Sequence, residues 1–221
     1  NKMTILEQAV QNSFFVIGRS ETLKALENFI KLTKIKGNSV EHVKNYFPLP
    51  VDLEHKNMVK LPIEEYNKGG TMNIRMDYAV TDKADGVRNL LYIDGKGKSY
   101  MLNREGYIVF TGLILSEYAN SILDGEFIDK LSDGKFVQNY YIFDVYIIKG
   151  ADLTKKKFGL ENDPNGRHIH IKKFLNYYNT SDTVLIEDHK YVLQIYAKKY
   201  YISNLSSHKK SDDNQIFNVC N

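Results

Sequence analysis

Apolar residues at strand-like spacing fill the middle of the chain, and turn residues separate them. The pattern predicts a short strand over 78–81, before Lys83, and further strands over 88–94, 98–103, 107–110, 122–128 and 140–148. A turn is expected at 95–97 and one helical turn within 115–121. A helix over 166–178 and strands near 183–187 and 191–196 follow. Because helices and strands do not alternate regularly, we expect an α+β fold with largely antiparallel sheets and flanking helices.

The first part of the chain has a helical pattern instead, over residues 3–46. Leu23, Leu26 and Ile30 form an apolar stripe, and Ser20 is a candidate N-cap residue. A further short helix is expected over residues 39–46. No residue of this segment indicates chemistry, so we expect it to serve in packing.

Length and composition suit one large domain or a domain with an appendage, since the chain has 221 residues and 43% of them are hydrophobic. Pro48 and Pro50 exclude regular helix after residue 47. We therefore expect a helical appendage, or the tail of a preceding domain, at 1–46 and the main domain at 47–221. The net charge of +3 is too small to indicate nucleic-acid binding by itself.

The single cysteine, Cys220, excludes an internal disulfide framework and a cysteine-based metal site, and it fits a reducing compartment. No apolar run reaches transmembrane length and no signal peptide is visible. We expect a cytoplasmic protein with no membrane partner. Because the first residue is Asn, we also expect this chain to be a piece of a longer protein.

The segment with the clearest chemistry is residues 78–88, Tyr-Ala-Val-Thr-Asp-Lys-Ala-Asp-Gly-Val-Arg. Lys83, Asp85 and Arg88 place an amine, a carboxylate and a guanidinium within reach of one ligand, and Gly86 allows a close backbone approach. A lysine amine attacks phosphorus only when unprotonated, so such a site must favour the neutral form through desolvation or neighbouring cations. The alternative is a surface hairpin turn, because Asp-Gly is a common turn signal.

Three later segments carry isolated polar groups. Asp124 and Glu126 flank a glycine inside an apolar strand, where a charge is expected only if it is paired or binds a metal; the alternative is another Asp-Gly turn. Asp144 is the single charge of the apolar run 140–148, so it either belongs to a buried network or serves a site. Phe143 suits base stacking or ordinary core packing. Arg104 precedes a glycine turn and, taken alone, is a solvated loop residue.

In order and spacing, these segments resemble the covalent nucleotidyltransferases, the superfamily of mRNA capping guanylyltransferases and polynucleotide ligases with an ATP-grasp-like domain. The resemblance covers residues 47–200, and the spelling around Lys83 is closest to the capping enzymes of large cytoplasmic DNA viruses. It implies that Lys83 becomes bonded to a nucleoside monophosphate. It also implies that the following residues contact the nucleotide: Asp85, Gly86, Arg88, Arg104, Glu126 and Phe143. Glu126 and Asp144 would bind or position Mg²⁺ or Mn²⁺.

The resemblance implies an mRNA guanylyltransferase that transfers GMP from GTP to the 5′-diphosphate end of RNA. An ATP-dependent ligase adenylation domain and a non-catalytic, degenerate module remain alternatives. Two downstream family motifs and an OB fold find no match, so we expect the domain to be truncated. The viral resemblance further implies fusion to RNA triphosphatase and cap methyltransferase domains. Lysine pairs at 172–173, 198–199 and 209–210 could form a basic surface for RNA, or plain solvated surface.

Overall fold

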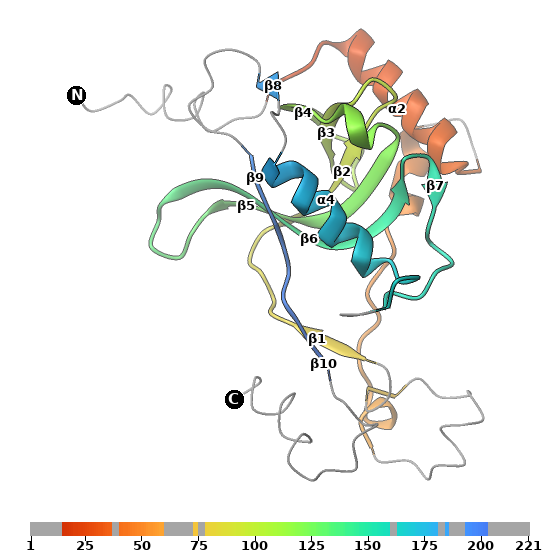
Figure 1. The fold of residues 1–221 in the computed structure, drawn as a ribbon, viewed down its shortest axis with the longest axis vertical. Helices are drawn as coiled ribbons and strands as arrows, with labels where there is room; N and C mark the ends of the chain where they lie inside the picture. Colours follow the sequence, from red (N-terminus) through yellow and green to blue (C-terminus); the bar gives the residue numbers. More distant parts are fainter. Residues whose placement is uncertain are drawn as a thin grey trace. The chain divides into compact units, whose positions relative to one another are not determined.

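The computed structural model describes residues 15–36, 40–59, 73–74, 78–159, 163–180, 184–185 and 193–202 (Figure 1). The chain divides into two compact units. The larger unit combines Asn1–Pro48 with Ala84–Ala197, and the smaller one combines Leu49–Lys83 with Lys198–Asn221. The predicted division into 1–46 and 47–221 stays a prediction.

The larger unit is built on one sheet, which has eight strands in the described part of the chain. Its strands are β2 (Val87–Ile93), β3 (Lys98–Leu102), β4 (Ile108–Ile114), β5 (Ser121–Lys130), β6 (Phe136–Ile148), β7 (Ala151–Asp152), β8 (Val184–Leu185) and β9 (Gln194–Ala197). Their order is β7-β6-β5-β2-β3-β4-β8, with β9 parallel to β6 and every other pair antiparallel. This arrangement confirms the α+β prediction. The 3-10 turn η3 (Ser116–Tyr118) confirms the helical turn between β4 and β5.

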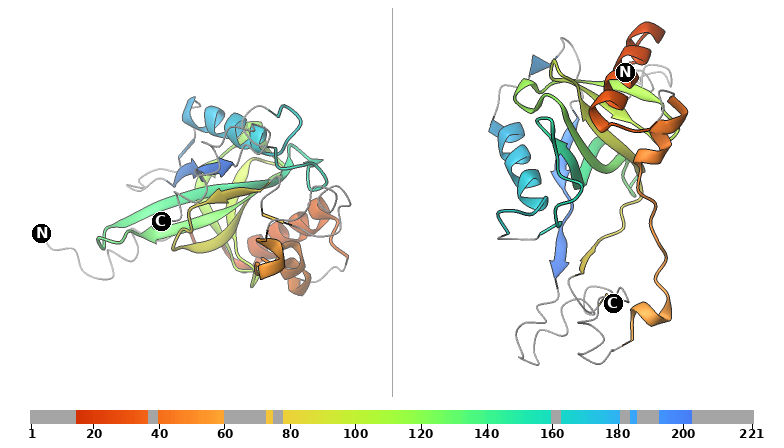
Figure 2. Two further views of the ribbon diagram at one scale, coloured as in Figure 1. Left: turned by 90° about the horizontal axis from the view of Figure 1, so that it is seen from below. Right: turned by 90° about the vertical axis from the view of Figure 1, so that its right-hand side faces the viewer.

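Helices cover both faces of this sheet (Figure 2). Helix α2 (Arg19–Thr33) and the 3-10 helix η1 (Val40–Tyr46) pack on one face, and α4 (His168–Thr180) packs on the other. Successive side chains of a strand point to opposite faces. Along β2, Leu90 and Tyr92 therefore join the core beneath α2, whereas Leu91 and Ile93 join the core beneath α4.

Helix α2 differs from its prediction in three respects. It begins after Gly18, so Ser20 lies within the first turn and is not the N-cap residue. Leu23 is 46% exposed, because the buried side of the helix carries Ala25, Leu26, Phe29 and Ile30. The chain before the helix is not helical throughout, since Phe15 forms an isolated bridge with Phe110 of β4. Residues 3–14 of the predicted helical segment lie outside the described residues.

The smaller unit contains a two-stranded antiparallel sheet of β1 (Ala79–Thr81) and β10 (Tyr200–Ile202). The hydroxyl of Thr81 donates a hydrogen bond to the carbonyl of Lys199, and the ammonium of Lys198 donates one to the carbonyl of Asp82. The 3-10 helix η2 (His55–Asn57) also belongs to this unit. The strand expected before Lys83 is confirmed, and it pairs with β10, which lies in the last described segment of the chain.

Candidate functional site

Two of the predicted motifs lie side by side on neighbouring strands. Arg88 of β2 is directly opposite Glu126 of β5, and the backbone N–H of Gly86 donates a hydrogen bond of 3.1 Å to Oε1 of Glu126. A Cβ atom at Gly86 would lie 2.5 Å from the carbonyl oxygen of Phe127, so only glycine permits this approach of the two strands. The sheet therefore brings together two motifs that are 40 residues apart.

Arg88 is held by a buried carboxylate. Its Nε and Nη2 donate to the two oxygens of Asp124, at 3.1 and 2.5 Å, and Nη1 donates to the carbonyl of Pro48 at 2.6 Å. The hydroxyl of Tyr146 donates a further short hydrogen bond to Asp124. Asp124 is fully buried, whereas the Arg88 side chain is 31% exposed. The bidentate geometry fixes the plane and direction of the Arg88 guanidinium.

The ionisation of this group follows from its burial and its pairing. Burial raises the pKa of the Asp124 carboxyl, while the hydrogen bonds from Arg88 and Tyr146 oppose that rise. Burial would lower the pKa of Arg88, but the hydrogen bond and charge of Asp124 raise it above the ordinary value. Burial, followed by the charge of Asp124, raises the pKa of Tyr146. Two donor groups on a carboxylate beside a permanently charged guanidinium favour the ionised pair.

Two aromatic rings flank the same guanidinium. The Arg88 Cζ atom lies 5.7 Å from the ring centroid of Phe47 and 5.6 Å from that of Phe143. Both distances suit cation–π contacts. Phe143 is half-buried, so part of its surface remains accessible. The predicted stacking of a base on Phe143 stays a prediction.

Asp144 has a partner that the sequence analysis did not identify. Arg167, just before α4, donates from Nε and Nη2 to the two Asp144 oxygens, at 2.8 Å each, and from Nη1 to the carbonyl of Lys156. The backbone N–H of Val145 also donates to Asp144, at 2.8 Å. A lone carboxylate in an apolar strand does signal a buried partner. That signal does not say which arginine of the chain supplies it.

A small cavity of about 320 Å³ adjoins these groups. It is lined by Tyr46, Pro48, Asp144, Tyr146, Thr154 and Arg167. The buried hydroxyl of Tyr46 has no hydrogen-bond partner among the described residues, and burial raises its pKa. The hydroxyls, carboxylate and guanidinium of this wall can form hydrogen bonds with a polar ligand.

The described residues do not fit a protein-built metal site. They contain no group of three or more His, Cys, Asp or Glu side chains that could hold an ion. Asp144 has both oxygens bound to Arg167, and Glu126 accepts from the Gly86 N–H. Direct metal ligation by either carboxylate would have to compete with these hydrogen bonds. Their predicted metal role stays a prediction.

The other predicted residues lie in exposed loops between strands. Lys83 ends one segment of the smaller unit, and the larger unit resumes at Ala84. Lys83 and Asp85 are exposed, as is Arg104 in the turn between β3 and β4. Within the described residues, Arg104 makes no hydrogen bond or ion pair with the other predicted site side chains of the larger unit. Exposed charged side chains such as these are accessible to a ligand.

Comparison with known protein families gives a match that covers most of the chain. A family model described as mRNA capping enzyme, catalytic domain, matches residues 19–219. No curated protein matches the chain. The described part of the chain contains no helix that is long and apolar enough to cross a membrane.

Proposed function

This chain belongs to the family of mRNA capping enzyme catalytic domains, a nucleotidyltransferase family, and we propose that it is an mRNA guanylyltransferase. It would transfer GMP from GTP to the 5′-diphosphate end of RNA through a covalent intermediate on Lys83. A role in cytoplasmic capping, viral origin, and fusion to triphosphatase and cap methyltransferase domains are further parts of this proposal.

The observation that carries the proposal is the pairing of β2 with β5. It aligns the Lys-x-Asp-Gly-x-Arg motif with Asp-Gly-Glu, through Arg88 opposite Glu126 and the Gly86–Glu126 hydrogen bond. Both motifs were expected to contact one nucleotide. Neighbouring strands in this register place the two motifs close enough for a shared contact.

The proposed chemistry has two steps, which share one nucleophile. The unprotonated Nζ of Lys83 attacks the α-phosphorus of GTP, a P–N bond forms, the bond to pyrophosphate breaks, and the amine loses a proton. In the second step, a terminal phosphate oxygen of the RNA attacks the same phosphorus. The P–N bond then breaks, and Lys83 regains a proton as the capped RNA leaves.

Other residues would bind and orient the nucleotide. Arg88, whose other donors are bound to Asp124, Pro48 and Tyr146, would offer the remaining N–H of Nη1 to the ribose or the α-phosphate. Glu126 would accept a ribose hydroxyl, and Phe143 would stack on the base. Asp85 and Arg104, both exposed, would complete the contacts from their loops. Mg²⁺ or Mn²⁺ would enter with GTP and neutralise triphosphate charge.

Intact-mass analysis after incubation with magnesium and either GTP or ATP tests this proposal. The wild-type chain should gain one guanylate, released by acid as expected of a phosphoramidate, and Lys83→Ala should gain none. Lys155→Ala removes an exposed lysine of the larger unit and serves as the matched control, with unchanged labelling. An adenylate adduct would identify a ligase-type enzyme instead. Guanylate on Lys83→Ala would show that another residue is the nucleophile.

A further inference from the structure

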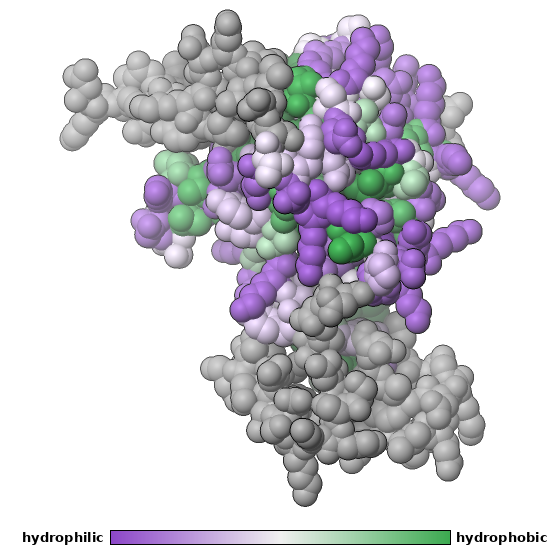
Figure 3. All heavy atoms as spheres, viewed as in Figure 1, coloured by the Kyte–Doolittle hydropathy of each residue, from purple (hydrophilic) through white to green (hydrophobic). Residues whose placement is uncertain are grey.

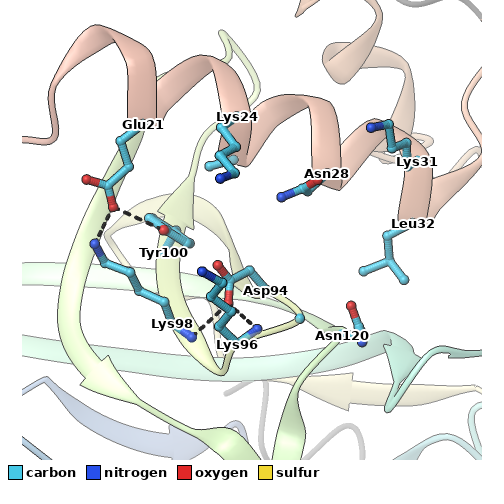
Figure 4. A pocket seen from close by; sticks show the side chains of 12 residues that line it. Glu21, Lys24, Asn28, Lys31, Leu32, Asp94, Lys96, Lys98, Tyr100 and Asn120 are labelled. Atoms are coloured by element: carbon cyan, nitrogen blue, oxygen red, sulfur yellow. Dashed lines mark hydrogen bonds and ion pairs between the residues drawn. The ribbon is translucent and has the colours of Figure 1, made fainter.

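The larger unit has a second, wider cavity, between α2 and the turn that joins β2 to β3 (Figure 4). Its volume of about 730 Å³ lies within the range of small-ligand sites. Such sites are usually lined by apolar side chains, but charged and amide side chains dominate here. The hydrophilic surface over α2 is also visible in Figure 3. The lining therefore favours a charged ligand.

The carboxylates of this cavity are already engaged. Glu21 accepts from the ammonium of Lys98 and from the hydroxyl of Tyr100, and the hydrogen bond from Lys98 lowers the pKa of Glu21. Oδ1 of Asp94 accepts from the backbone N–H groups of Lys96 and Lys98, at 2.8 and 2.9 Å. Lys98 neutralises Glu21, whereas backbone N–H groups stabilise Asp94 without removing its charge. Four lysines therefore face two carboxylates, and the lining keeps a net charge of 4 − 2 = +2.

Three lysines of the cavity remain unpaired. Lys24, Lys31 and Lys96 are exposed and form no ion pair or hydrogen bond through their ammonium groups with any residue that the structure describes. Lys24 and Lys31 share one side of α2 with Asn28, at the spacing of helical neighbours, and Lys96 lies on the opposite wall. Like charges that surround one hollow repel one another, and a bound anion relieves that repulsion.

We propose that this cavity binds backbone phosphates of the RNA acceptor, downstream of its 5′ end. The inference rests on the proposed function, which supplies an RNA substrate. Arg88 lies near the start of β2, and Asp94, which lines the cavity, comes just after its end. At about 3.3 Å per residue, the backbones of these two residues are about 20 Å apart along the strand. A mononucleotide does not span that length, whereas an RNA chain does. Three cations on facing walls suit consecutive phosphates of one strand.

RNA binding by the full chain tests the proposal. The cavity variant Lys24→Ala/Lys31→Ala/Lys96→Ala is compared with a control variant, Lys135→Ala/Lys155→Ala/Lys157→Ala, which removes the same charge from exposed lysines of the larger unit. The probe is a 5′-diphosphate RNA of about ten nucleotides, within the usual range of single-strand site sizes. Affinity is measured by fluorescence anisotropy over a series of salt concentrations.

The cavity variant should bind this RNA at least about tenfold more weakly at low salt, and its salt-dependence slope should fall by about 2, because each lost phosphate contact removes about 0.7. The control variant should stay within about twofold of wild type. An equal loss in both variants would overturn the proposal. The proposal would also fail if the cavity variant lost affinity for inorganic triphosphate as strongly as for RNA, which would indicate a free-phosphate site. An equally strong loss of poly-glutamate binding would indicate an acidic protein partner instead.

Guanylate labelling from GTP alone separates this proposal from the one on which it rests. That step uses no RNA, so the cavity variant should form the covalent adduct as wild type does. Loss of the adduct in the cavity variant alone would mean that these lysines serve GTP, which contradicts an RNA-specific site. Absence of the adduct in wild type would refute the guanylyltransferase proposal, while the RNA-binding comparison would still show whether the cavity binds RNA.

Discussion

The buried Asp124 carboxylate offers the sharpest test of the structure. Asp124→Asn keeps the shape of the side chain but removes the charge that holds Nε and Nη2 of Arg88. It also replaces the carboxylate that accepts a hydrogen bond from the Tyr146 hydroxyl by a neutral amide. The variant therefore leaves a guanidinium without its counter-charge at a position where strand β2 meets strand β5.

The magnitude follows from the burial of the two partners. Removing one member of a buried ion pair costs about 3–5 kcal/mol of unfolding free energy, because the other charge stays desolvated. Asp124 is fully buried, but Arg88 keeps 31% of its side-chain surface, and the Pro48 carbonyl still accepts from Nη1. Water can partly solvate the orphaned guanidinium. We therefore expect a loss near the lower end of the range, about 3 kcal/mol.

Urea denaturation followed by far-ultraviolet circular dichroism measures this loss. Asp129→Asn, an exposed carboxylate of the same strand, is the matched control and should stay within about 0.5 kcal/mol of wild type. Arg88→Met with Asp124→Leu should be less destabilised than the sum of the two single variants, because neither charge is then left alone. If Asp124→Asn is as stable as Asp129→Asn, the buried ion pair described above does not stabilise the protein.

Two further predictions concern packing and pH. Gly125→Ala should cost about 1–3 kcal/mol of unfolding free energy, because the new Cβ would lie 2.5 Å from the ring of Tyr140. Gly95→Ala is the control and should cost less, because its Cβ would meet only the Asn120 side chain, at 3.4 Å. Equal losses in urea denaturation would contradict this prediction. Burial lowers the pKa of His170 below its ordinary value near 6.5, so the unfolded chain binds the proton more tightly and stability should be lost as pH falls through about 6.5. His170→Gln should flatten the stability profile between about pH 7 and pH 5, and an unchanged slope in denaturation experiments would show that His170 is not the group responsible.

The local pattern of apolar residues was sufficient to predict which segments form strands and which form helices. Runs of apolar residues predicted strands that correspond to β2, β3, β5 and β6, because a sheet covered on both faces buries successive side chains of each strand. Helix α2 was found from its period, but its buried side was misassigned at Leu23, since the period does not say which of several apolar positions faces a partner.

The candidate site was also partly accessible from residue types. Carboxylates within apolar strands are rare unless paired, and Asp124 and Asp144 were noticed for that reason. Both could be predicted as buried or functional groups without knowing which residue pairs with them. The structure supplies the partners, Arg88 for Asp124 and Arg167 for Asp144.

What the sequence determined alone was therefore local: which segments are strands or helices, and which polar groups in them require a special environment. Tertiary structure decided which groups meet, as in Arg88 with Asp124, 36 residues away, and Arg167 with Asp144, 23 residues away. It also decided that α2 and the β2–β3 turn enclose a cavity with three unpaired lysines among the described residues. The physical reason is that these contacts join residues far apart in the chain, and their meeting depends on strand order and register and on how the helices pack on the sheet.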